Sequence, residues 1–240
     1  LDDPQRIVSV AVTSTGETGF PLDAQGEATY ESIAWFDGRT KAEAQWLDEH
    51  IGADRLFAIT GLSLQPIFSL CKILWLRKHA PEAYARTVRW LNAADFVAFR
   101  LCGVAATDRS LASRMLMLNL HEMRWATELL DEVDIPHDLL APLLPSGTPL
   151  QQITAEAAAL TGLPPSTLVS VGGHDHVCGA LAVGVTEPGN MLNSLGTAEA
   201  VFLPLRRPMT DPQTGRQGYT QGAHTAGDYY VFAGSYTSGV

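Results

Sequence analysis

The segment that most constrains the fold is an apolar stretch that ends in two glycines and leads directly into a helix-forming sequence. Residues 168–173 (Leu-Val-Ser-Val-Gly-Gly) have the composition of a short buried strand. Residues 177–185, rich in Ala, Gly and Val, are typical of a closely packed helix. His174, Asp175 and His176 stand between the two. Because ligands in α/β sheets sit at the carboxyl ends of strands, this junction predicts a functional site.

The order of the other predicted elements indicates an α/β architecture with a helical insertion. Strands come first, then a run of helices, then the strand–helix junction, then strands again. The expected strands are residues 7–12, 20–23, 30–35, 191–195, 200–203 and 229–233. One expected helix begins at a capping box (Thr40 to Glu43), and another begins at Asn92 and ends at Gly103. The other expected helices cover residues 69–79, 108–116, 125–132 and 154–160.

The composition is that of a globular protein. Hydrophobic residues make up 46% of the chain and charged residues 18%, the balance of a protein with a large core. The net charge is −10 and the 16 Lys and Arg residues do not cluster, so no nucleic-acid partner is expected. No apolar run approaches the ~20 residues of a membrane span, so no membrane partner is expected either. Three cysteines without a CxxC pair indicate buried thiols in a reducing cytosol, and hence a cytoplasmic protein.

Asp175 has the clearest chemical potential at the strand–helix junction. An aspartate at a helix start, after two glycines that allow close approach, can face a ligand crevice. The simpler alternative is that Asp175 only caps the helix, and the pattern alone does not decide between them. A metal site built from His174 and His176 is not expected, because neighbouring side chains at a helix start diverge and no further His or Cys cluster supports them.

A second candidate is the turn Ser194-Leu-Gly-Thr197, which follows an expected strand. Its amides and hydroxyls are suited to a phosphate group. Such strings are also common in ordinary turns between strands, so this motif is weak when it stands alone.

A third candidate is the turn Thr13–Gly19, which carries Glu17 just beyond an expected buried strand. A carboxylate there suits the recognition of hydroxyl groups, and Trp35 downstream could cover the apolar face of a sugar. The alternative is a surface turn and a core tryptophan. Asp37 and Arg39 are expected only to tie a loop together.

Together these segments resemble the FGGY carbohydrate kinases, the family that includes glycerol kinase and xylulose kinase. The segments that carry the resemblance occur in the family's order along almost the whole chain. They are Glu17-Thr18 before Asp23, Trp35-Phe-Asp-Gly-Arg39, Lys72 within Phe68–Trp75, Thr107–Arg114, Leu118–His121 with Trp125, Gly172-Gly-x-Asp175 and Ser194-Leu-Gly-Thr197. Each is a modest signal, but their shared order makes chance a poor explanation.

The resemblance implies the actin-like ATPase fold, in which two ribonuclease-H-like α/β domains flank a cleft. Residues 1–185 would form most of the N-terminal sugar-binding domain, with the helical insertion. Residues 186–240 would begin the C-terminal nucleotide-binding domain. The family's first strand with its phosphate loop would precede Leu1, and its adenine-binding segment would follow Val240. We therefore expect the chain by itself to be inactive.

The resemblance also implies roles for individual residues. Asp175 matches the family's catalytic base, and the segment around Asp108 is expected to be structural. ATP and Mg²⁺ are the implied cofactors. The residues implied to bind are Glu17, Trp35 and His176 for the substrate, and Gly196 and Thr197 for ATP.

Gly16 is a departure from the family pattern, because glycerol kinase has a glycerol-binding arginine at this place. Without that arginine, charge-assisted hydrogen bonds worth ~1.5–3 kcal/mol each are lost, so glycerol is expected to bind poorly. The room left by the glycine would suit a four- to six-carbon polyol or ketose. The alternative is that another side chain fills the gap.

The sequence therefore predicts ATP-dependent phosphorylation of a hydroxyl on a small sugar or polyol, such as a pentulose or tetritol, with Asp175 as general base. The alternative is a non-catalytic sugar-binding or regulatory protein that keeps the kinase fold. An actin-like ATPase without a sugar substrate would explain neither Glu17 nor the helical insertion at 69–160. The sequence leaves open the sugar, the hydroxyl that is phosphorylated and the oligomeric state, for which a homodimer is one option.

Overall fold

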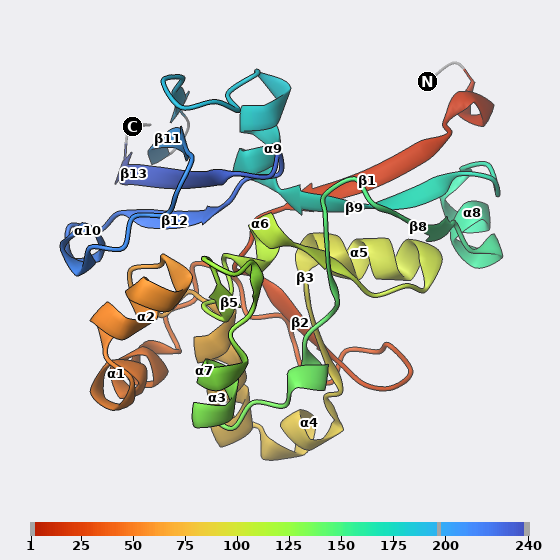
Figure 1. Cartoon of the computed structure of the whole chain (residues 1–240). Helices are drawn as coiled ribbons and strands as arrows, with labels where there is room; N and C mark the ends of the chain where they lie inside the picture. Colours follow the sequence, from red (N-terminus) through yellow and green to blue (C-terminus); the bar gives the residue numbers. More distant parts are fainter. Residues whose placement is uncertain (1–2, 196–197, 238–240) are drawn as a thin grey trace.

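The computed structural model describes residues 3–195 and 198–237, which form two sheets above a helical region (Figure 1). The first sheet contains, in spatial order, β1 (Ser9–Ser14), β9 (Leu168–His174) and β8 (Pro149–Gln152). β1 runs parallel to β9, whereas β8 runs antiparallel to it. Because the register pairs Ser14 with His174, the two parallel strands end at the same edge of the sheet.

Helices lie on both sides of this sheet (Figure 1). α5 (Ala93–Cys102) packs along β1 and β9, and α8 (Ala155–Thr161) packs on α5. α9 (Asp175–Ala182) rises from the end of β9 on the side away from α5. The helix start that follows β9 is therefore held by a covered sheet, which places its first residues reproducibly.

The largest core belongs to the helical region. Its helices are α1 (Lys41–His50), α2 (Ala53–Thr60), α3 (Ser69–His79), α4 (Pro81–Arg86) and α7 (Thr127–Glu132). α3 is surrounded by the others, and Leu70, Ile73 and Leu76 on it are almost completely buried. The first part of α3, residues 69–74, is buried on all sides and is therefore a rigid support for any polar side chain that it carries.

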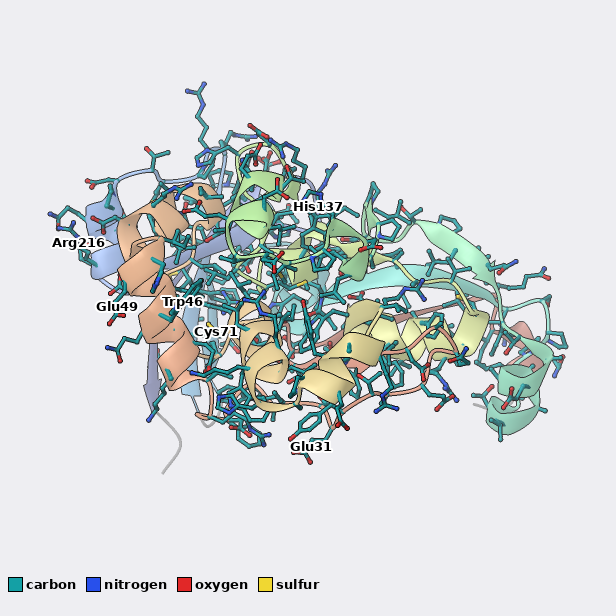
Figure 2. All side chains as sticks on the ribbon, turned by 90° about the horizontal axis from the view of Figure 1, so that it is seen from below. Glu31, Trp46, Glu49, Cys71, His137 and Arg216 are labelled. Carbon is teal, nitrogen blue, oxygen red and sulfur yellow. The ribbon has the colours of Figure 1, made fainter. Side chains whose placement is uncertain are left out.

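The second sheet is antiparallel throughout. Its strands, in spatial order, are β10 (Leu192–Leu195), β11 (Ala198–Leu205), β13 (Tyr229–Thr237) and β12 (Thr220–Ala223). β12 contacts α6 (Arg109–Ala112), and α10 (Pro212–Arg216) contacts α2. Figure 2 shows Arg216 of α10 beside the helices α1 and α2, where it forms an ion pair with Asp54. The second sheet thus packs directly on elements that precede α9.

The remaining elements are short. They are η1 (Pro4–Arg6), β2 (Gly19–Leu22), β3 (Arg89–Asn92), β4 (Thr107–Asp108), β5 (Leu118–Asn119), β6 (Arg124–Trp125), η2 (His137–Leu139) and β7 (Leu143–Leu144). β2 pairs with β3, β4 with β7 and β5 with β6. Within the described ranges, no helix has the length and apolar character needed to cross a membrane.

Several predicted elements are confirmed. The helix expected at 69–79 is α3, and the strand expected at 168–173 is β9. Those expected at 7–12 and 20–23 correspond to β1 and β2, shifted by one or two residues. β3, β12, α2 and α4 had no predicted counterpart.

The strand predicted at 30–35 is wrong. This segment is irregular, and its pairing is a single bridge between Gly19 and Ile33. The ammonium of Lys72 accounts for the difference, because Nζ donates to the carbonyl oxygens of Ile33 at 3.0 Å and Ala34 at 3.2 Å. Carbonyl groups that bind a buried cation are not available for a regular strand ladder.

The helix predicted from Thr40 begins where expected, with Thr40 at the N-cap of α1, but its capping interaction is missing, and a second predicted helix has wrong boundaries. The capping box is absent, because the Thr40 hydroxyl donates to the carbonyl oxygen of Pro66 and makes no cap hydrogen bond to α1. The helix predicted at 177–185 begins earlier, at Asp175, and ends at Ala182. The site residues discussed below therefore lie in the first turn of α9.

Candidate functional site

The candidate site lies where the turns after β1 and β9 meet. Residues 15–17 follow β1, and Asp175 and His176 follow β9, its parallel neighbour. The turn after β1 contacts the end of β9, because a Cβ placed on Gly16 would lie 3.1 Å from the ring of His174. The topology therefore brings Glu17 and Asp175 to one edge of the sheet.

Asp175 presents its carboxylate to solvent at the start of α9. Its side chain is 48% exposed. Oδ1 accepts a hydrogen bond from the backbone amide of His176 at 2.7 Å and lies 3.5 Å from Nε2 of His174. Oδ2 accepts no hydrogen bond from any described residue. The N-cap position belongs to His174, so the simple capping interpretation does not describe Asp175.

Glu17 is the opposite case, a buried carboxylate held by a buried arginine. Nε of Arg114 donates to Oε1 of Glu17 at 2.7 Å, and Nη2 lies 2.5 Å from the same oxygen as part of the ion pair. The hydroxyl of Thr15 donates to Oε2 at 3.1 Å. Burial favours the protonated acid, but the guanidinium of Arg114 outweighs it and, with His174 and Thr15, lowers the pKa of Glu17 to about 2. Glu17 is thus a fixed anion near neutral pH.

His174 lies between the two carboxylates. Its ring is buried, and burial lowers its pKa to about 4, with Arg114 adding to the effect. Nδ1 of this ring has no hydrogen-bond partner among the described residues. A neutral imidazole next to Glu17 and Asp175 separates two acidic groups without adding charge.

The two histidines of the His-Asp-His segment differ in exposure. His174 is buried, His176 is exposed, and their rings meet edge to face with centroids 5.8 Å apart. Across residues 3–195 and 198–237, no three His, Cys, Asp or Glu side chains are placed to hold a metal ion together.

Lys72 connects the Glu17 turn to the segment that carries Trp35. Nζ donates to the carbonyl oxygens of Glu17, Ile33 and Ala34, and the side chain is fully buried on α3. Burial lowers the pKa of Lys72 to about 8. One ammonium group therefore fixes the position of Trp35, the next residue in the chain, relative to Glu17.

Trp35 is half-exposed, at 50% of its surface, and its ring contacts that of Phe36 edge to face. This leaves an aromatic face available to a ligand, and the alternative of a core tryptophan is not observed. Asp37 and Arg39 form an ion pair at 2.8 Å, and Arg39 lies over the ring of Trp75. The loop-tying role expected for Asp37 and Arg39 matches this geometry.

The short helix α6 contacts the end of β9, and the residue that follows α6 contacts the second sheet. Asp108 accepts hydrogen bonds from the amide and the hydroxyl of Ser110, and the Ser110 oxygen accepts one from the backbone amide of His174 at 2.9 Å. The hydroxyl oxygen of Ser113 accepts one from the amide of Ala223 on β12. The segment predicted to be only structural therefore supports the catalytic candidate and links it to the second sheet.

The room predicted beside Glu17 does not exist. A Cβ placed on Gly16 would lie 2.6 Å from both Cβ and Cγ of Arg114. The stem of Arg114 fills this space and brings a guanidinium to Glu17 from a different part of the chain. The argument for a larger substrate that rested on Gly16 is therefore wrong, and the alternative, that another side chain fills the gap, is correct.

Gly172, in contrast, serves the backbone. An added Cβ would overlap the carbonyl oxygen of Val12, at the point where the register of β1 and β9 shifts. The glycine pair was expected to admit a ligand or a neighbouring backbone, and Gly172 admits the neighbouring strand.

Of the predicted site residues, the structure brings Glu17, Asp175 and His176 together, with Trp35 tied to the first of them through Lys72. The ring of His176 packs against Phe232 of β13, with centroids 5.6 Å apart. Gly196 and Thr197 lie outside the described residues.

Sequence reasoning missed Arg114 and His174 as site residues. Arg114 appeared only within a motif, and His174 only as a metal ligand that was set aside. The usable signal was the glycine beside Glu17, because a glycine next to a buried acid indicates close approach of another group. Which group approaches depends on contacts between residues 97 positions apart.

The fold and the site together define a class of protein. An exposed carboxylate at the end of a parallel strand, beside a recessed carboxylate–guanidinium pair, is suited to binding and activating a small hydroxylated molecule. Residues 2–182 match the N-terminal domain of the FGGY family of carbohydrate kinases. The chain belongs to this family.

Relatives agree with this assignment. Xylulose kinase of Bacillus subtilis (strain 168) is 33% identical over 181 residues, which are 75% of this chain and 36% of that protein. L-fuculokinase of Escherichia coli (strain K12) is 30% identical over 198 residues, 82% of this chain and 42% of that protein. The crystal structure of xylulose kinase from Rhodospirillum rubrum matches with a TM-score of 0.86 at 27% identity, over 95% of this chain and 46% of that one. The chain spans less than half the length of these relatives, and the predicted family and actin-like fold class are confirmed.

Proposed function

We propose that the protein containing this chain transfers the γ-phosphoryl group of ATP to a hydroxyl of a small sugar or polyol. The observation that carries the proposal is the half-exposed Asp175 carboxylate at the end of β9, beside the recessed Glu17 at the end of β1. Membership of a carbohydrate kinase family supports the reaction class.

Asp175 acts as the general base in this proposal. As the substrate oxygen forms its bond to the γ-phosphorus, Oδ2 of Asp175 takes the hydroxyl proton. The bond from the γ-phosphorus to the bridging oxygen breaks, and ADP leaves with that electron pair. The products are a sugar phosphate, ADP and a proton on Asp175, which passes to solvent through the exposed side of the carboxylate.

Glu17, Trp35 and His176 would hold the substrate. The Glu17 carboxylate accepts a hydrogen bond from a neighbouring hydroxyl, and the exposed ring of Trp35 covers carbon atoms. His176 lies one residue after Asp175 and contacts hydroxyls on the exposed side. These roles rest on the family resemblance together with the positions of the side chains.

The nucleotide enters as its magnesium complex, in which Mg²⁺ neutralises phosphate charge. On the resemblance, Gly196 and Thr197 approach the ATP phosphates. We also propose that 1–185 belongs to the sugar-binding domain and 186–240 to the nucleotide-binding domain, in a cytoplasmic protein. Closure of the two domains would exclude water, which otherwise accepts the phosphoryl group.

The relatives suggest the class of sugar. Two of them are named for xylulose and one for L-fuculose. We propose a four- to six-carbon ketose or polyol as the substrate, such as a pentulose or a tetritol, in preference to glycerol. This preference now rests on the relatives, because Arg114 occupies the space beside Gly16.

A substrate screen of the complete gene product tests the proposal. ADP release is measured with MgATP and a panel of pentuloses, tetritols, deoxyhexuloses and glycerol, and the phosphate ester is identified by mass spectrometry. Sugar-dependent ADP release with formation of the ester is the expected result. Calorimetric binding of a sugar without turnover would favour the non-catalytic alternative, and neither binding nor turnover across the panel would overturn the proposal.

A further inference from the structure

We propose that Arg114 is a positioning residue of the sugar site, which fixes the Glu17 carboxylate so that Oε2 alone is left to accept a substrate hydroxyl. The inference rests on the proposed function and adds to it a residue outside the predicted site. It follows from the geometry of one buried ion pair and from the groups that surround it.

The hydrogen bonds of Glu17 set how many more it can accept. Nε of Arg114 donates to Oε1 at 2.7 Å and Nη2 lies 2.5 Å from the same oxygen, so the guanidinium covers Oε1. Oε2 accepts one hydrogen bond, from Thr15 at 3.1 Å. A carboxylate oxygen has about two lone-pair positions. One position on Oε2 therefore remains for a ligand, in a direction fixed by the planar guanidinium.

Arg114 itself has little freedom. Its stem packs on Gly16, where even a methyl group would clash. Its guanidinium lies between the rings of Phe68 and Phe232, at 5.6 and 5.8 Å from their centroids. An arginine held on three sides transmits its own position to Glu17.

Among the described residues, none of the other titratable groups that face Glu17 can supply the positive charge that Arg114 provides. Besides Arg114, these groups are His174 at the end of β9, Lys72 on α3 and Tyr230 on β13. His174 is neutral at neutral pH, and Lys72 is occupied by backbone carbonyl oxygens. Burial raises the pKa of Tyr230, so it stays neutral as well. Removing Arg114 leaves burial as the main influence on Glu17, which favours the protonated acid.

The kinetic consequence separates positioning from a merely structural role. In the Arg114→Met variant, Glu17 is expected to take up a proton within the working pH range. KM for the sugar then rises ~10–100-fold at pH 7, as expected for a lost hydrogen bond to a charged group. KM recovers as the pH increases, whereas kcat changes less. Arg114→Lys keeps the charge without the fork and gives an intermediate KM.

The experiment measures kcat and KM between pH 5 and 9 for the complete gene product, with the sugar that the screen identifies. The variants are R114M, R114K, E17Q and the double variant E17Q/R114M. For R114M, the expected result is an additional decrease in kcat/KM toward low pH, which E17Q does not show. The kcat/KM of the double variant should be no lower than that of E17Q. A KM of R114M equal to wild type at every pH would overturn the inference, and so would full additivity of the two substitutions.

Two further comparisons keep the test decisive. If R114M does not fold, the double variant and R114K remain, because neither leaves a buried unpaired carboxylate. A KM of the double variant higher than that of E17Q would contradict the inference. R55M is the matched control, because Arg55 pairs with Glu132 at 2.8 Å on an exposed surface. An inactive wild type would reject the proposed function, whereas an active wild type with an unaffected R114M would reject only the role of Arg114.

Discussion

The turn after β1 and the first turn of α9 follow neighbouring parallel strands, but their carboxylates differ in exposure and in bonding partners. Glu17 is 6% exposed and is held by Arg114 and Thr15. The side chain of Asp175 is 48% exposed, and its contacts are a backbone amide and a histidine edge. The turn that carries Glu17 is held in place by its partners, and we call it the locked turn. The turn that carries Asp175 is exposed to solvent, and we call it the open turn.

The difference indicates that the two carboxylates have different roles, one in binding the substrate and one in accepting a proton. A group that binds substrate benefits from a fixed direction, because no ordering is then required when the ligand arrives. A group that accepts a proton must be reachable and must stay free of strong partners that would lower its basicity. The locked turn therefore suits recognition, and the open turn suits the chemical step.

The largest expected effect comes from the open turn. In the Asp175→Asn variant the base is lost, so kcat should fall by ~10² to 10⁴. Asparagine keeps an oxygen for the amide of His176, and the position is exposed, so the free energy of unfolding should change by about 0.5 kcal/mol or less. Steady-state kinetics and urea unfolding of the complete gene product measure both quantities. A kcat close to wild type would contradict the role of Asp175 as base.

Glu17→Gln should give the reverse pattern. The amide cannot neutralise the buried Arg114, and breaking a buried pair costs roughly 3–5 kcal/mol of stability. KM for the sugar should rise by ~10-fold or more, with a smaller change in kcat. The same kinetic and unfolding measurements apply. A stable E17Q variant with unchanged KM would remove the contrast between the two turns.

His174 lies between the turns and should make stability depend on pH. Its folded-state pKa is lowered to about 4 from its usual 6.5, so between these values the unfolded chain binds a proton that the native protein does not. Stability should therefore fall as the pH decreases from 6.5 to 4, by at most about 1.4 kcal/mol per pH unit. His174→Gln should reduce this slope, relative to wild type, in urea titrations at a series of pH values. An unchanged slope in H174Q would show that His174 titrates normally.

Trp35 should have the smallest effect of the four. Its half-exposed ring is joined to Glu17 indirectly, through the carbonyl of Ala34 and Lys72. Trp35→Ala should raise KM for the sugar about 3- to 10-fold and leave kcat nearly unchanged, as expected for loss of an aromatic contact. Phe36→Ala, at the neighbouring exposed ring, is the control. Equal changes in both variants would indicate a general effect on the loop.

Much of the fold could be predicted from local pattern. The helix at 69–79 and the strand at 168–173 were found because apolar periodicity and terminal glycines are local signals. The strand at 30–35 could not be rejected in this way, because the cation that binds its carbonyl oxygens comes from Lys72, 38 positions away from Ala34.

The site was predicted unevenly for the same reason. Asp175 stands at a strand–helix junction, which is visible in a single stretch of sequence. Two partners of Glu17, Lys72 and Arg114, are not visible there, because they come from α3 and from the segment after α6. The prediction of free space beside Gly16 failed because it considered only the missing side chain of the glycine. The side chain of Arg114, from a distant part of the chain, fills that space.

The sequence by itself determined the family, the strand that leads to Asp175 and the presence of two acidic segments, since short-range patterns encode each of them. Only the tertiary structure decided which acid is locked and which is open. Burial and ion pairing depend on which distant segments pack together, and Arg114 reaches Glu17 across 97 positions of the chain. The chemical character of a carboxylate is set by the charges and solvent within a few ångströms of it, and those are brought there by folding.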